Sequence, residues 1–223
     1  MSDLQHCTSI TYVPATSVVL NVIIHALYGM SSAQYSPPFT ALVTAIDQMP
    51  YYEIDPKQCV VPSNPLHAQL LSHASTNPLE LYALAARHDM YNIAAYASSH
   101  LISYPLNTIG DEMAIQIGAV YLKRLLCLHV ERSNALRNII LVAPLPHLPT
   151  ALCPFDAQQS LIRAWATAVS SLAVDARPDL SAAYMRSVFA PLQNRLTCPS
   201  CRENFLDRVE DVMLQWSAVK STI

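Results

Sequence analysis

The fold is decided near the N-terminus, by the stretch Thr16-Ser17-Val18-Val19-Leu20-Asn21-Val22-Ile23-Ile24-His25-Ala26-Leu27-Tyr28-Gly29. Thr16 and Ser17 are residue types that cap the first turn of a helix, and Gly29 is suited to end one. Apolar residues occupy both faces between these limits, which is typical of a helix that is buried all round. Residues 4–46 hold no Lys, Arg, Asp or Glu, so this helix must be covered on several sides.

Working outward, apolar residues recur at helical spacing and prolines stand between the recurring runs. The spacing predicts helices over 38–49, 66–73, 77–86 and 91–101, a long helix from Asp111, and three more helices beyond Pro154. The last of these has a charged outer face, made of Glu203, Asp207, Arg208, Glu210 and Asp211. The run 10–13, before Pro14, is the one strand-like segment.

These patterns predict a mainly α-helical fold. We expect a multi-helix array of about 8–10 helices, with at most one or two short N-terminal strands. Pro105 separates the two predicted domains, 1–105 and 106–223.

Composition narrows the classes of partner. Only 13% of the residues are charged, against roughly 25% in ordinary soluble domains, and 52% are apolar. The net charge of −3 argues against nucleic acid as a ligand, because binding phosphates needs a basic face. The longest apolar run, 18–30, is too short to span a bilayer, so we expect no membrane contact. The N-terminus has no basic region, so we expect no signal peptide. The scattered cysteines favour a reducing compartment, the cytoplasm or the nucleus.

The six cysteines are scattered, unlike a disulfide framework, and two of them form the pattern Cys198-Pro199-Ser200-Cys201. This spacing lets two thiolates reach one Zn²⁺ at the start of a helix. Cys153 and Asp156 repeat the spacing at another predicted helix start. If both starts pack together, Cys153, Asp156, Cys198 and Cys201 form a structural zinc site, with His147 as a rival fourth ligand.

Two other interpretations of the same cysteines stay open. They are ordinary semi-buried thiols, or they form a redox pair, although a redox pair would lack the βαβ context of thioredoxin-like motifs. Apart from zinc, we expect no cofactor.

No pattern of catalytic residues stands out. The sequence lacks a phosphate-binding glycine loop, a nucleophile elbow and an HExxH pattern, and its eight histidines are dispersed. His25, within the apolar helix, is interpreted as a core or interface histidine. We therefore predict that the protein is not an enzyme.

Several short stretches carry a family resemblance: residues 18–29 (VVLNVIIHALYG), 82–89 (YALAARHD), 121–125 (YLKRL), 175–179 (DARPD) and 215–217 (QWS). Together they resemble the fungal, mainly basidiomycete, proteins that contain a BTB/POZ domain. The resemblance covers most of the chain. It implies that 10–13 and 18–29 are a late strand and helix of that domain, followed by its further helices and a helical C-terminal extension.

The strands and helices that begin a BTB domain are missing before residue 1, so the resemblance implies a truncated domain. It also implies a protein–protein interaction module that homo-oligomerises or acts as an adaptor, with a Cullin-type ubiquitin ligase as one partner. We place the interface on the exposed face of the first helix, at Val19, Ile23, Ala26 and Leu27. The alternative is a structural helical remnant that needs its missing half to fold, with or without the small zinc site.

Overall fold

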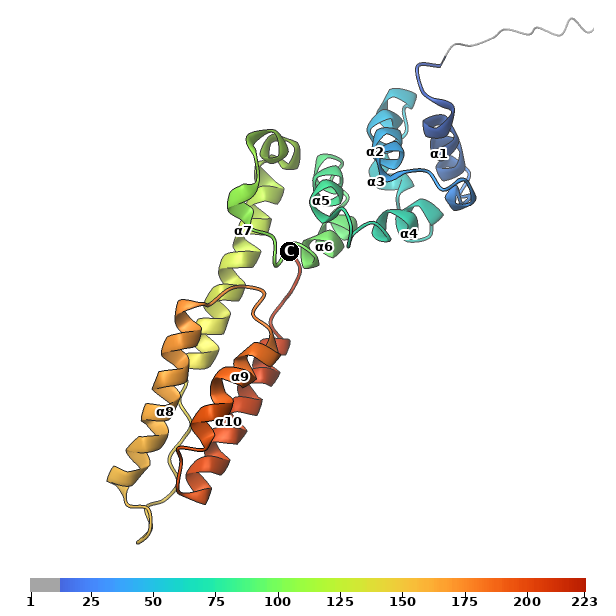
Figure 1. The fold of residues 1–223 in the computed structure, drawn as a ribbon. Coiled ribbons are helices and arrows are strands. Elements are labelled where there is room, and N and C mark those ends of the chain that lie inside the picture. The colour runs from blue at the N-terminus through green and yellow to red at the C-terminus, as the bar shows by residue number, and fades with distance from the viewer. Residues whose placement is uncertain (1–12) are drawn as a thin grey trace, which may run out of the picture. The chain divides into compact units, whose positions relative to one another are not determined.

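The computed structural model describes residues 13–223 of the chain (Figure 1). Within that range it contains ten α-helices, three short 3-10 helices and an isolated β-bridge between Thr150 and Cys153. The expected mainly α-helical fold is therefore confirmed. The strand expected at 10–13 lies, except for its last residue, outside the described residues.

The chain divides into two compact units, Met1–Ile93 and Ala94–Ile223, twelve residues before the division at 105 expected from the sequence. The described helices of the first unit are α1 (Ser17–Leu27), α2 (Phe39–Gln48), α3 (Pro56–Cys59), α4 (Pro65–Leu71) and α5 (Pro78–Arg87). Helix α6 (Tyr91–Ser99) crosses the division. The second unit contains α7 (Asp111–Leu141), α8 (Phe155–Val174), α9 (Ala182–Gln193) and α10 (Pro199–Ser217).

Helix α1 begins and ends where the sequence predicts. The Thr16 hydroxyl accepts a hydrogen bond from the Val19 amide at 3.4 Å. At the other end Gly29 adopts φ 64°, and the Met30 amide donates to the His25 carbonyl at 2.7 Å. This left-handed closure favours glycine, which has no Cβ to clash.

The expected exposed face of α1 is wrong for three of its four residues. Val19, Ile23 and Ala26 are 5%, 3% and 3% exposed, because they lie on the side of α1 that packs against α2. Leu27, at 57% exposed, is the one member that faces solvent. The helix is also not buried all round, since Val18 lies at its solvent side.

Helices α7, α8, α9 and α10 lie side by side in the second unit (Figure 1). Their core centres on three rings: Trp165 of α8 stacks on Phe189 of α9 at 4.8 Å, and Phe205 of α10 meets both edge-on. The Trp165 indole N–H donates to the Ile140 carbonyl at 3.0 Å, so the polar end of the buried ring is satisfied.

Arg208 was expected on the charged outer face of α10, but it is buried. Its Nε donates to the Val142 carbonyl at 2.9 Å, and its Nη2 donates to the Ile139 carbonyl. The guanidinium also pairs with Asp211. These carbonyls end helix α7, where the helix dipole favours a cation. Arg208 therefore ties the end of α7 to α10.

Helix α7 is broken at Gly118, whose φ of 74° and ψ of 158° lie outside the helical region. By length and composition alone α7 is long and apolar enough to cross a membrane. An uninterrupted apolar run does not mark this segment in the sequence, because Lys123 and Arg124 divide it. Only 22% of its most apolar 18-residue stretch is buried in the unit. Tyr121, Leu125 and Leu128 are among the buried residues of α7.

Candidate metal centre

Four potential metal ligands from two distant segments come together in the second unit. His147 and Cys153 belong to the connection between α7 and α8, and Cys198 and Cys201 belong to the start of α10. Their ligand atoms all lie within 4.8 Å of one another. The expected convergence of Cys153, Cys198 and Cys201 is therefore present.

Two of the distances between donor atoms are close to those of a tetrahedral zinc site, and the whole set lies within 4.8 Å. With Zn–S bonds of about 2.3 Å, two thiolates of a tetrahedron lie about 3.8 Å apart, and a thiolate and an imidazole nitrogen lie about 3.5 Å apart. The Cys153 and Cys201 sulfurs are 3.8 Å apart, and the Cys198 sulfur is 3.3 Å from Nε2 of His147. A disulfide would need about 2 Å between its sulfurs.

The two cysteines of α10 are placed by the first turn of the helix. Cys198 is the N-cap residue, with an extended backbone, and Pro199 occupies the first helical position. Proline favours this position because its missing N–H is not needed there. Cys201, two residues on, turns into the core and is 1% exposed. Both sulfurs therefore lie in the first turn of the helix, whose positive end favours the thiolate of Cys198.

Cys153 is held by a tight turn of its own segment. Its amide contacts the Thr150 carbonyl and hydroxyl oxygens, each at 3.1 Å, and the Thr150 amide donates back to the Cys153 carbonyl. The same carbonyl accepts a hydrogen bond from Nε2 in the side chain of Gln158, a buried residue of α8, at 3.3 Å. The turn thus presents the Cys153 thiol to α10 independently of any metal.

His147 has the tautomer that a metal ligand requires. Its Nδ1 lies 2.7 Å from the Leu148 carbonyl oxygen, which is an acceptor only, so Nδ1 carries the proton. The lone pair is then on Nε2, the atom that faces the Cys198 sulfur. Metal-bound histidines commonly donate their second nitrogen in this way.

The three thiols differ in acidity. The Cys201 backbone N–H donates to the Cys198 sulfur and, against the cost of burial, lowers the pKa of Cys198 to about 7. Burial raises the pKa of Cys153 and of Cys201. At neutral pH the centre therefore holds one thiol poised to ionise and two that keep their protons until a cation displaces them.

Asp156 is the expected ligand that the structure does not bring to the centre. It lies in the first turn of α8 and is exposed, and it is not one of the four residues whose donors converge. The loop before Cys153 folds back instead, so that His147, the rival fourth ligand, completes the set. The prolines on either side of His147 indicate that the chain turns in this connection. They do not indicate toward which helix it turns.

Comparisons with known proteins identify no relative: no family model matches the chain, and neither the curated proteins nor the solved structures give a match. The resemblance to fungal BTB/POZ proteins accordingly stays a prediction.

Proposed function

We propose that the second unit binds one structural Zn²⁺ through His147, Cys153, Cys198 and Cys201, and that the chain acts as a non-catalytic protein-interaction module. The observation that carries the proposal is the convergence of four protein donors within 4.8 Å of one another, with the Cys153 and Cys201 sulfurs 3.8 Å apart. Three thiolates and one imidazole are a ligand set typical of structural zinc. A catalytic zinc keeps a position open for water, and four protein ligands leave none.

The role of the metal follows from where its ligands lie. It would clamp the connection between α7 and α8 onto the first turn of α10, segments about fifty residues apart in the chain. The connection contains no helix between Leu141 and Phe155, so it lacks the regular backbone hydrogen bonds of a helix. Free thiols at five described cysteines support a cytoplasmic or nuclear location, where thiolates remain available to zinc.

The interaction role is supported by apolar side chains left in solvent. Charged residues make up only 13% of the chain, and Leu145, Leu148 and Leu152 are 82%, 87% and 98% exposed. Large exposed apolar patches mark sites of association.

The first experiment measures metal in the full chain, purified under reducing conditions from zinc-supplemented cells. We expect about one zinc per chain, and a cobalt-substituted sample with the absorption of tetrahedral thiolate ligation. Cys201→Ser and His147→Ala should lose the metal. Two matched controls should keep it: Asp156→Asn, at the expected but unused ligand, and Cys127→Ser, at an exposed cysteine of α7.

Less than about 0.2 zinc per chain in the unaltered protein would overturn the metal proposal. A metal-free chain that forms a Cys198–Cys201 disulfide in air would favour the redox interpretation instead. Light scattering over a dilution series tests the interaction role: a discrete species supports it, and a polydisperse aggregate favours the structural remnant.

A further inference from the structure

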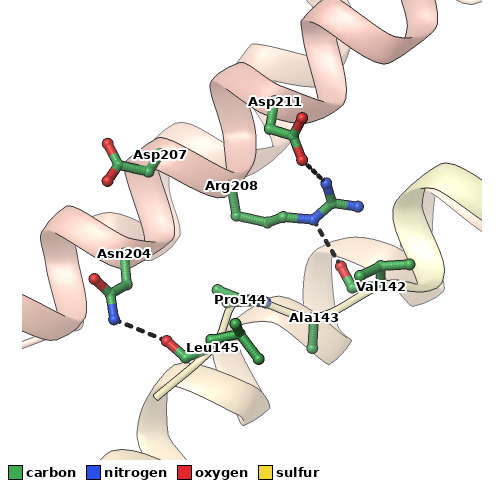
Figure 2. Close-up of a pocket in the computed structure, with 8 residues that line it drawn as sticks. All are labelled: Val142, Ala143, Pro144, Leu145, Asn204, Asp207, Arg208 and Asp211. Atoms are coloured by element: carbon green, nitrogen blue, oxygen red, sulfur yellow. Dashed lines mark hydrogen bonds and ion pairs between the residues drawn. The ribbon is translucent and has the colours of Figure 1, made fainter. Parts of the chain in front are cut away.

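A groove runs beside the metal centre, between the end of α7 and helix α10. Figure 2 shows its two walls: residues 142–145 form one, and Asn204, Asp207, Arg208 and Asp211 of α10 form the other. The hollow between them measures about 430 Å³. This is enough to take one or two side chains of another molecule.

Hydrogen bonds hold the walls together at two points. The Asn204 side-chain amide donates to the Leu145 carbonyl at 2.8 Å, and Nε of Arg208 donates to the Val142 carbonyl at 2.9 Å (Figure 2). Prolines at 144 and 146 restrict the backbone of the loop wall. The groove is therefore preorganised, which lowers the entropic cost of binding.

The loop wall is apolar and continues into the clamped connection. Residues 138–155 include no Lys, Arg, Asp or Glu. Leu145 lines the groove and is 82% exposed, and Leu148 and Leu152 are more exposed still. Burying such side chains against a partner removes apolar surface from water and so favours association.

The wall of the groove that α10 forms has one unpaired charge, and that charge is negative. The charge of Arg208 is taken up by Asp211 and by the two carbonyls at the end of α7. Asp207 lies one helical turn before Asp211 and is exposed, and among the described residues no cation pairs with it. A ligand of the groove therefore meets an apolar wall and one unpaired carboxylate.

The charges around the groove indicate which kind of molecule could bind in it. An anionic lipid surface attracts Lys and Arg, whereas this surface offers Asp207. A second copy related by two-fold symmetry would have to supply a cation from this same patch. Within 138–162 there is no Lys or Arg, and on α10 Arg202 already donates to the Leu196 carbonyl.

We propose that the groove between residues 142–145 and α10 docks a segment of another protein, which inserts an apolar side chain beside Leu145 and sets a Lys or Arg against Asp207. The proposal rests on the proposed function, since the zinc clamp would hold the loop wall in place. Electrostatic complementarity would orient the segment, and apolar burial would supply most of the affinity.

The test is a selection of peptides from a random 16-residue display library on the full chain, loaded with zinc. We expect selected peptides to combine Leu, Ile or Phe with neighbouring Lys or Arg. For a synthetic copy of the best one, Asp207→Lys should weaken binding about tenfold, since it replaces one attraction with a repulsion. Leu145→Ser should weaken it by a similar factor. Glu131→Lys, an exposed charge reversal on α7, should leave it unchanged.

Three results would overturn the proposal. The first is selected peptides without basic residues, or with an affinity indifferent to Asp207→Lys. The second is a dimer of the chain that Leu145→Ser converts to a monomer. The third is sedimentation with anionic vesicles that depends on Leu145. Zinc content, measured on the same samples, reports on the clamp separately: a metal-free chain that still selects basic, apolar peptides contradicts the zinc proposal and upholds the groove.

Discussion

The guanidinium of Arg132 lies over the indole ring of Trp216, 4.5 Å from the ring centroid. Its Nε donates to the Pro178 carbonyl at 2.9 Å, and its Nη1 donates to the Val219 and Lys220 carbonyls at 2.8 Å. A cation in the middle of α7 thus organises the segment that leads into α9 and the residues that follow α10. Removing the Arg132 side chain would take the donor from three carbonyl oxygens and the cation from the face of the Trp216 indole.

Replacement of Arg132 by Leu should therefore destabilise the second unit by about 2–4 kcal/mol, because a buried guanidinium that donates three hydrogen bonds is lost. Arg132→Lys should recover part of the loss, since a lysine keeps the charge but not the planar fork. The measurement is urea unfolding at fixed zinc concentration. Arg163→Leu, on the exposed side of α8, is the matched control and should change stability by less than about 0.5 kcal/mol. Equal losses for the two leucine variants would contradict the structural role of Arg132.

Helix α1 offers a matched pair of substitutions. Ile23→Asp should unfold the first unit, because the side chain is 3% exposed and a carboxylate there costs roughly 3 kcal/mol or more. Leu27→Asp, at 57% exposed, should leave the helix content and thermal midpoint nearly unchanged. Circular dichroism with limited proteolysis measures both. If Ile23→Asp stays folded and changes only the association state, the face of α1 that carries Ile23 is an interface after all.

Asp47 gives the first unit a dependence on pH. Burial raises the pKa of its carboxyl, but the hydrogen bond from His88 at 2.7 Å and the charge of Arg87 at 2.9 Å outweigh burial and lower it. A lowered pKa contributes stability above the unfolded value near 4, which is lost as the pH falls through the folded value.

Asp47→Asn should therefore lower the free energy of unfolding at neutral pH, by about 1 kcal/mol or less because the carboxylate is partly exposed. The difference between the variant and the unaltered chain should vanish once the pH falls below the lowered pKa of Asp47, where both side chains are neutral. Chemical unfolding at several pH values measures it. A difference that is the same at low and neutral pH would assign the effect to packing and not to charge.

Zinc affinity should rise steeply with pH. Burial raises the pKa of Cys153 and Cys201, so that zinc must displace both of their protons. Two displaced protons correspond to about a hundredfold gain in affinity per pH unit. Competition with a chromophoric chelator, corrected for the chelator's own protonation, measures the slope. A slope near one proton, or tenfold per pH unit, would show that one of the two buried thiols does not bind the metal.

The helices could be predicted because their signals are local. Thr16, Gly29 and Pro78 act on the turns in which they stand, so the ends of α1 and α5 fall within a few residues of the predicted limits. The choice between His147 and Asp156 was not local. It depended on how the proline-rich connection folds back, which only the packing of α10 decides.

Arg208 was assigned to solvent for a related reason. An amphipathic pattern divides the residues of a helix by polarity, and so it predicts that every arginine lies on the solvent-exposed side. It has no way to represent a guanidinium that satisfies the last carbonyls of a different helix. The prediction for α1 was wrong in the opposite sense: Val19 and Ile23 were assigned to an exposed face, but they are buried where α1 packs against α2.

The spacing of the four ligands also has a kinetic consequence. Cys198 and Cys201 are separated by two residues and can capture a metal ion within microseconds of meeting it, whereas Cys153 lies 48 residues from Cys201. Unlike a zinc finger, where the metal nucleates its own small fold, this centre would close only after α8 and α9 have brought the connection back to α10. Full tetrahedral coordination would therefore be a late event in folding, and its rate would report on tertiary assembly of the second unit.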